Sequence, residues 1–319
     1  MPKQGYHHLT SDQRCQIEAL KGMLSATQIA LKIGVHPSTL SRELARNSSL
    51  KGAYFFKVAQ KLAQERRRLA STRPRRLSDS NVAYIKARLC DKWSPEQIAG
   101  YCKVQGLFRV SHESIYKIVW KDKAKGGRLY QHLRHTGKKY YQSRSRAGRA
   151  HIPHRVDIGE RPMIVEQKSR IGDLEGDTII GAKHKGAILS HVDRHSKFTK
   201  LALLKDKTAA SVLKGVKASL GPLKDYLYTL TYDNGSEFSG HIDISQALQV
   251  SCFFARPYHS WERGLNEHTN GLIRQYFPKK THFDTLTCQM VQEVEDALNH
   301  RPRKSLGFKT PHQVFFSSA

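Results

Sequence analysis

Strand and helix patterns alternate between residues 165 and 277 of this 319-residue chain. Short apolar or alternating runs predict strands, and apolar residues at helical spacing predict the helices between them. The predicted strands cover residues 173–181, 186–192, 198–204, 226–232 and 250–255, and the predicted helices cover residues 208–220 and 261–277, with a short helix before the last strand. The first three strands follow one another directly, so we expect an antiparallel meander. Helices separate the later strands, which predicts a mixed α/β domain.

Residues 1–120 show helix patterns alone. Thr10, Ser25 and Ser94 each precede a glutamine by three residues, which is the capping-box signature of a helix start. The α/β half that follows has the element order of a ribonuclease-H-like fold. We therefore expect a multidomain chain, with all-α helix-turn-helix modules at the N-terminus and an α/β ribonuclease-H-like catalytic domain after them.

Two segments of the first half fit helix-turn-helix units. Ala30, Gly34 and Leu40 fall where such a unit needs a small residue, a turn glycine and a core residue. A plain helical bundle with a solvated face is the alternative. Short polar and arginine side chains on the outer face of the third helix would suit base edges and phosphates, and these are Ser38, Thr39, Ser41, Arg42 and Arg46. The second segment has a weaker pattern, and its outward candidates are His112, Ser114 and Lys117.

Positive charge is concentrated before residue 157. Residues 1–156 contain 32 Lys and Arg against 9 Asp and Glu, a net charge of +23, whereas residues 157–319 contain 22 against 18, a net charge of +4. Clustered cations favour a polyanion partner, because they release counterions from phosphates. Ribosomal and RNA-binding proteins share this signature, but the helix-turn-helix patterns favour double-stranded DNA.

These patterns divide the chain into five segments. We expect a first helix-turn-helix domain in residues 1–50, a basic helical connector in residues 51–76, a second helix-turn-helix-like domain in residues 77–120, a basic linker in residues 121–160 and the catalytic domain in residues 161–319. Eleven Lys and Arg and one acid lie in residues 121–156. Because like charges repel, we expect this linker to become ordered on DNA.

Three acids lie where the predicted sheet can bring them together. Asp177 lies in the first strand, Asp233 directly follows the fourth, and Glu267 lies in the helix after the fifth. Each has an ordinary alternative, because Asp-Asn-Gly is a common turn and a helical glutamate is commonly a surface charge. An acid within an Ile-rich strand costs desolvation energy unless a cation is near. Asp173 and Glu175 share a strand face with Asp177, so spacing does not choose among them.

Converging carboxylates would hold two Mg²⁺ ions, with Mn²⁺ as a substitute, because hard oxygen ligands suit these metals. One ion would lower the pKa of a water or a DNA 3′-hydroxyl, and the other would stabilise the leaving oxygen. Arg263 lies one turn before Glu267 and Arg274 two turns after it. Both are candidates for holding DNA phosphates, with a surface salt-bridge stripe as the alternative.

The chain also resembles the transposases of the IS-thirty family of insertion sequences, over nearly its whole length. The segments that carry the resemblance include Glu175-Gly176-Asp177-Thr178, Thr231-Tyr232-Asp233-Asn234-Gly235-Ser236-Glu237-Phe238, residues 257–264, residues 266–278 and the tail from Leu298 to Pro311. Leu174 stands where Trp is expected, and His268 stands where Asn is usual. Both flank the acids and replace none of them.

The resemblance implies that Asp177, Asp233 and Glu267 are the catalytic and metal-binding residues. It implies an Asp-Asp-Glu transposase that binds the terminal inverted repeats of its element. Such an enzyme cuts DNA and joins it to target DNA by metal-dependent phosphoryl transfer. Synapsis of two ends predicts a homo-oligomer. The alternative is a non-catalytic sequence-specific repressor derived from a transposase, against which the intact acids argue.

The sequence predicts no membrane segment, no signal peptide and no disulfide framework. No run of about 18 apolar residues predicts a transmembrane helix, and the N-terminus has no apolar signal region. The five cysteines are scattered, which predicts reduced thiols without a disulfide framework. We expect a bacterial cytoplasmic protein that associates with the nucleoid and has no membrane partner.

Overall fold

The computed structural model describes residues 8–49, 52–71, 77–134, 152–256 and 264–317. It divides into two compact units, Met1–Arg76 and Leu77–Ala319, and each contains its own hydrophobic core. Among the described residues, no helix is both long and apolar enough to cross a membrane.

The described part of the first unit contains the helices α1 (Ser11–Leu20), α2 (Ala26–Lys32), α3 (Pro37–Asn47) and α4 (Phe56–Ser71). Thr10 and Ser25 form the predicted capping boxes of α1 and α2. Gly34 has a φ of +71° in the turn before α3, and Ala30 and Leu40 are fully buried in the core, as the helix-turn-helix pattern requires.

α4 differs from the connector expected from its charge. Its Ala59 is fully buried in the same core as Leu40, and the helix contacts both α1 and α3. Tyr54, just before α4, lies in this core as well. The apolar residues of this segment therefore attach a strongly basic helix to the first unit.

The second unit begins with α5 (Asp79–Cys90), α6 (Pro95–Val104) and α7 (His112–Ala124), which enclose a core around Ile85, Ile98 and Ile115. Ser94 forms the predicted capping box of α6. This helical region continues into the predicted linker. The Asp122 carboxylate accepts a hydrogen bond of 3.1 Å from the backbone N–H of Leu129, and Leu129 packs into the same core.

A five-stranded mixed sheet forms the rest of the second unit. Its strands are β1 (Asp173–Ile180), β2 (Ala187–Asp193), β3 (Thr199–Leu204), β4 (Thr229–Tyr232) and β5 (Ser251–Phe254), in the spatial order β3-β2-β1-β4-β5. β1, β2 and β3 form the predicted antiparallel meander, and β4 runs parallel to both β1 and β5. β4 begins three residues later than predicted, because residues 221–226 form a 3-10 helix that starts at Gly221-Pro222.

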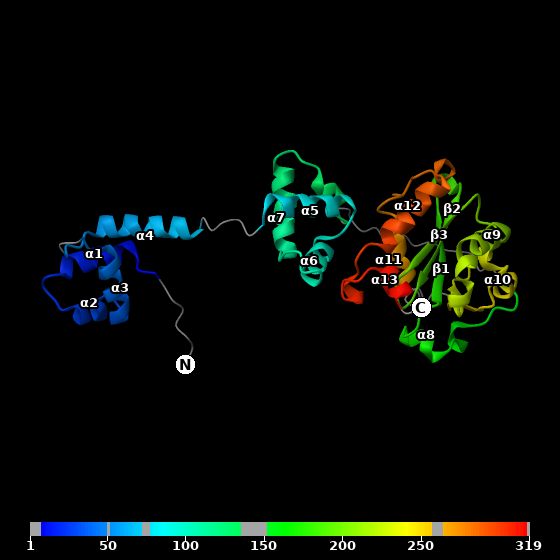
Figure 1. Ribbon diagram of the computed structural model, residues 1–319, viewed down its shortest axis with the longest axis horizontal. Coiled ribbons are helices and arrows are strands. Elements are labelled where there is room, and N and C mark those ends of the chain that lie inside the picture. The colour runs from blue at the N-terminus through cyan, green and yellow to red at the C-terminus, as the bar shows by residue number, and fades with distance from the viewer. Residues whose placement is uncertain (1–7, 50–51, 72–76, 135–151, 257–263, 318–319) are drawn as a thin grey trace. The chain divides into compact units, whose positions relative to one another are not determined.

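Helices cover both faces of this sheet (Figure 1). α9 (Ala209–Leu220) and α10 (His241–Leu248) pack on one face, in a core that includes Leu189. α11 (Gly264–Ile273) and α12 (Cys288–Asn299) pack on the other face, in a core that includes Ile188. Neighbouring residues of β2 thus enter opposite cores, as strand geometry requires. α13 (Pro311–Phe316) ends the described chain, with Phe315 stacked on Phe198.

Candidate active site

Asp177 and Asp233 lie at the same edge of the sheet. β1 and β4 pair in parallel, with Glu175 opposite Thr231. Two residues further along each strand, Asp177 and Asp233 are therefore level with each other, and equal steps along paired strands lead to the same sheet face. Both side chains are partly exposed. The structure brings these two predicted site residues together.

The three acids of β1 have different surroundings. Asp173 is fully buried and accepts hydrogen bonds of 2.8 and 3.0 Å from Arg170, and one of 2.7 Å from the Thr229 hydroxyl. Glu175 is buried and forms an ion pair of 2.9 Å with Arg194. These two acids compensate buried or half-buried arginines, which gives them structural roles. Asp177 is the acid of β1 that lies at the surface, beside Asp233.

Asn270 links the Asp177 carboxylate to α11. Its side-chain amide donates a hydrogen bond of 2.7 Å to Oδ2 of Asp177. Its amide oxygen accepts one of 3.2 Å from the Ser190 hydroxyl of β2. Oδ1 of Asp177 accepts a hydrogen bond of 2.9 Å from the backbone N–H of Thr178. These bonds hold the carboxylate in one orientation and fix α11 against the first two strands.

The turn after β4 positions Asp233. The backbone N–H of Gly235 donates a hydrogen bond of 3.0 Å to Oδ1 of Asp233, as expected for Asp-Asn-Gly. The Asn234 amide donates one of 2.7 Å to the carbonyl of Ala255, which attaches this turn to the residue after β5. The turn interpretation and the site interpretation of Asp233 are thus compatible, because the turn itself orients the carboxylate.

Glu237 is a residue of this region that was not predicted from the sequence as a site residue. It is 3% exposed, accepts a hydrogen bond of 2.8 Å from the Thr178 hydroxyl and forms an ion pair of 2.8 Å with Lys207. It therefore ties the segment after Asp233 to the residue after Asp177. Its place in the motif Asp-Asn-Gly-Ser-Glu-Phe was visible in the sequence, but its contact with Thr178 depends on the β1–β4 register.

Glu267 lies on α11, one turn before Asn270, and its side chain is exposed. The hydrogen bond of Asn270 to Asp177 places this part of α11 against β1. In the described ranges, no three His, Cys, Asp or Glu side chains are already close enough together to hold a metal ion. The structure thus places Glu267 on the helix next to the two aspartates and does not bring the three carboxylates into contact.

Arg263 and Arg274 are the two arginines predicted beside Glu267. Arg263 lies outside the described residues. Arg274 is partly buried, donates a hydrogen bond of 2.8 Å to the carbonyl of Ile180 and lies 5.4 Å from the centre of the Phe283 ring. Burial lowers the pKa of Arg274 from its usual value. Arg274 therefore attaches the end of α11 to the end of β1, and its predicted contact with a DNA phosphate stays a prediction.

The predicted DNA contacts lie on α3 and α7. On α3, Ser41, Arg42 and Arg46 are exposed, and Ser38 and Thr39 are partly exposed. On α7, His112 and Lys117 are exposed, and the Ser114 hydroxyl lies 3.0 Å from that of Ser111 at the helix start. The outer face of α3 is therefore available for the role predicted for it, while Ser114 takes part in capping α7.

Comparison with known proteins gives consistent matches over the whole chain. Residues 5–47 match a family model described as a helix-turn-helix domain. The chain is 45% identical over 311 residues to the transposase for insertion sequence element IS4351 of Bacteroides fragilis, covering 97% of this chain and 95% of that protein. It is 36% identical to the transposase for insertion sequence element IS1086 of Cupriavidus metallidurans, covering 98% of this chain and 96% of that protein.

A third relative is the transposase InsI for insertion sequence element IS30A of Escherichia coli K12. It is 35% identical to this chain and is matched over 98% of this chain and 84% of its own length. These identities extend through the helix-turn-helix domain and the mixed sheet alike. The chain belongs to the IS-thirty family of insertion-sequence transposases.

Proposed function

We propose that this transposase cuts and joins DNA strands in a ribonuclease-H-like domain, with Asp177, Asp233 and Glu267 as its catalytic and metal-binding residues. The observation that carries the proposal is the β1–β4 register. It makes Asp177 and Asp233 level with each other at one sheet edge. Asp173 and Glu175, the other two acids of β1, are buried and form ion pairs with arginines. Asn270 of α11 bonds to Asp177, and Glu267 lies one turn away on the same helix.

The donor set fits a divalent metal. Carboxylate oxygens are hard ligands that suit Mg²⁺ and Mn²⁺, and two ions can be shared among three carboxylates. Like charges repel, so bringing Glu267 to the two aspartates requires cations between them. When bound, the metal ions would supply Lewis acidity to the attacking hydroxyl and the leaving oxygen. Asp177 and Asp233 would bind the metal ions from the edge of the sheet, and Asn270 would orient Asp177. Glu267 would supply the third carboxylate ligand from α11.

The helical regions supply the DNA recognition in this proposal. The helix-turn-helix domain presents the outer face of α3, and α5 to α7 form a second helical region that carries further candidate contacts on α7. Two reading modules suit a long terminal inverted repeat. Joining two ends in one reaction requires two copies of these modules, so we propose a homo-oligomer at synapsis.

The test compares metal-loaded and metal-free reactions on DNA that carries the ends of the element. We expect strand nicks at the ends and joined products with Mg²⁺ or Mn²⁺, and neither with EDTA, while binding to the ends persists. Specific binding without cleavage under every metal condition would favour the alternative of a non-catalytic repressor.

A further inference from the structure

We propose that α3 and α4 of the first unit form a cleft that binds backbone phosphates of duplex DNA, with Arg46, Arg66 and Arg67 as the ligands. This inference rests on the proposed DNA-binding role of the helix-turn-helix domain. It adds a binding surface on a helix that the charge pattern alone describes as a connector.

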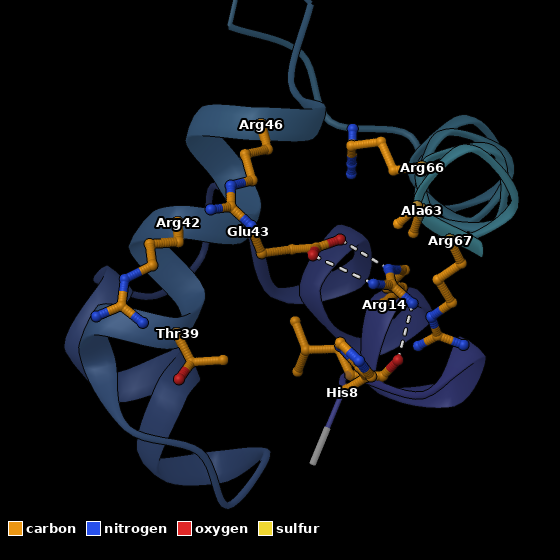
Figure 2. Close-up of a pocket in the computed structure, with 11 residues that line it drawn as sticks. His8, Arg14, Thr39, Arg42, Glu43, Arg46, Ala63, Arg66 and Arg67 are labelled. Carbon is orange, nitrogen blue, oxygen red and sulfur yellow. Dashed lines mark hydrogen bonds and ion pairs between the residues drawn. The ribbon is translucent and has the colours of Figure 1, made fainter. Parts of the chain in front are cut away.

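The cleft lies between the two helices and has a volume of about 500 Å³. Figure 2 shows Arg42 and Arg46 on α3 at one side, Arg66 and Arg67 on α4 at the other, and the Arg14–Glu43 pair between them. The α4 side also carries the small side chains of Ala63 and Ala70. Small residues on this wall leave room for a sugar-phosphate backbone.

The buried pair between the two walls is electrically balanced. Arg14 donates hydrogen bonds of 2.7 and 3.2 Å to the two carboxylate oxygens of Glu43, and the Tyr54 hydroxyl donates one of 3.1 Å. Burial raises the pKa of Glu43, but the hydrogen bonds and charge of Arg14 outweigh it, and the net effect lowers this pKa. Among the described residues that line the cleft, the single acid is therefore ionised and already neutralised by Arg14.

Four further arginines line the cleft. In the described residues, Arg42, Arg46, Arg66 and Arg67 form no ion pair. Arg66 donates a hydrogen bond of 2.5 Å to the side-chain oxygen of Asn47, which positions its guanidinium at the cleft without changing its charge. The cleft thus concentrates positive charge from two helices around the neutral Arg14–Glu43 ion pair. This charge distribution favours an anionic ligand.

Duplex DNA fits this cleft better than a small anion does. Guanidinium groups bind phosphate oxygens with a planar pair of donors, and several of them together suit successive phosphates. Thr39 and Arg42 of the candidate base-reading helix line the same cleft. A duplex read by α3 therefore has a phosphate backbone running beside α4. In this arrangement Arg66 and Arg67 hold the backbone and carry no sequence information.

The test is the salt dependence of DNA binding by the full chain, measured on a duplex with the element's end and on a random duplex of equal length. Arg66→Ala/Arg67→Ala should reduce the slope of log K against log salt concentration by about 0.9 for each phosphate that the variant no longer neutralises. The matched control is Lys57→Ala/Lys61→Ala, which removes the same charge from exposed positions of α4 outside the cleft. The control should reduce the slope by less than half as much.

Arg67→Ala alone is a second variant, because Arg66→Ala also removes the hydrogen bond to Asn47. It should reduce the slope by about 0.9 on both duplexes, leave the end-to-random affinity ratio unchanged and leave the melting temperature unchanged. Equal slopes for the cleft variant and the lysine control would overturn the cleft. If the wild type does not distinguish the two duplexes, the proposed end recognition fails instead, and the slopes on random DNA still test the cleft.

Discussion

Gly176 lies between buried Glu175 and the partly exposed Asp177 on β1. A Cβ at this position would lie 2.3 Å from Cε1 of Tyr232. That ring cannot give way easily, because it stacks on Phe238 with the ring centres 4.2 Å apart and its hydroxyl lies 3.0 Å from Nε2 of His191. Only glycine therefore allows β1 and the Tyr232 ring to approach as they do.

We expect Gly176→Ala to lower the free energy of unfolding of the sheet by about 1–3 kcal/mol, the usual cost of overpacking a core. Native-state hydrogen exchange of the β1 and β2 amides in the full chain measures it. Gly221→Ala is the control, since a Cβ there meets nothing within 4 Å and the backbone is already helical. Equal protection in both variants would contradict this role of Gly176.

His191 gives the sheet a defined pH dependence. Burial lowers the pKa of this histidine from 6.5 to about 3. Below pH 6.5 the unfolded chain therefore binds a proton that the folded chain does not, and stability falls as the pH falls toward 3. The loss approaches about 1.4 kcal/mol per pH unit as the unfolded histidine becomes fully protonated, and between pH 6.5 and pH 5 it sums to about 2 kcal/mol.

His191→Gln keeps a polar side chain and removes this titration. We expect the variant to lose about 2 kcal/mol less stability than wild type between pH 6.5 and pH 5. Hydrogen exchange of the β2 amides measures this difference. Other histidines contribute equally to both proteins, so the difference isolates His191. Parallel stability curves for the two proteins would show that His191 does not cause the loss.

Asn270 is a positioning residue for Asp177 in the proposed site. Asn270→Ala removes the donor to Oδ2 while leaving all three acids in place. We expect strand joining to fall by about 10–100-fold and the half-maximal Mg²⁺ concentration to rise, as for other losses of a hydrogen bond to a metal ligand. A slower reaction with unchanged metal dependence would indicate a structural role alone.

At the level of elements, the predicted recognition of DNA sequence can be tested on α3. Arg42 is exposed on its outer face. If it binds a guanine through both donors, Arg42→Ala should relax specificity at one base pair by about 1–3 kcal/mol, measured with a set of singly substituted end duplexes. Equal weakening on random DNA would instead make Arg42 a phosphate contact like Arg66.

The periodic elements were predictable from the sequence, and the contacts between them were not. Capping boxes at Thr10, Ser25 and Ser94 predicted the helix starts, and apolar runs predicted where the strands lie in the sequence, because both signals are local. The start of β4 was wrong by three residues, since the 3-10 helix before it has no strong pattern of its own.

The same distinction between local signals and contacts across the fold applies to the candidate site. Alternation on β1 could not choose among Asp173, Glu175 and Asp177, because the choice depends on which arginines lie nearby. Arg170 is close in sequence, but Arg194 reaches Glu175 through the fold. The structural role of Arg274 was also missed, because its partner is the carbonyl of Ile180, 94 residues away.

Across the full chain, the proposed function assigns recognition and chemistry to different parts of the protein. The helix-turn-helix match ends at residue 47, whereas the three acids lie between residues 177 and 267. Changing the chemistry should therefore leave DNA binding intact. Most of the net charge also lies before residue 157, away from the acids in the sequence.

Glu267→Gln is the sharpest test of the proposed active site, because it removes one negative charge and keeps the shape of the side chain. We expect this variant to lose both strand cleavage and the joining of pre-cleaved ends, while its affinity for end DNA stays within a few fold of wild type. Glu293→Gln, the same change at an exposed position of α12, should retain both activities. Wild-type joining of pre-cleaved ends by Glu267→Gln would contradict the assignment of Glu267 to the active site.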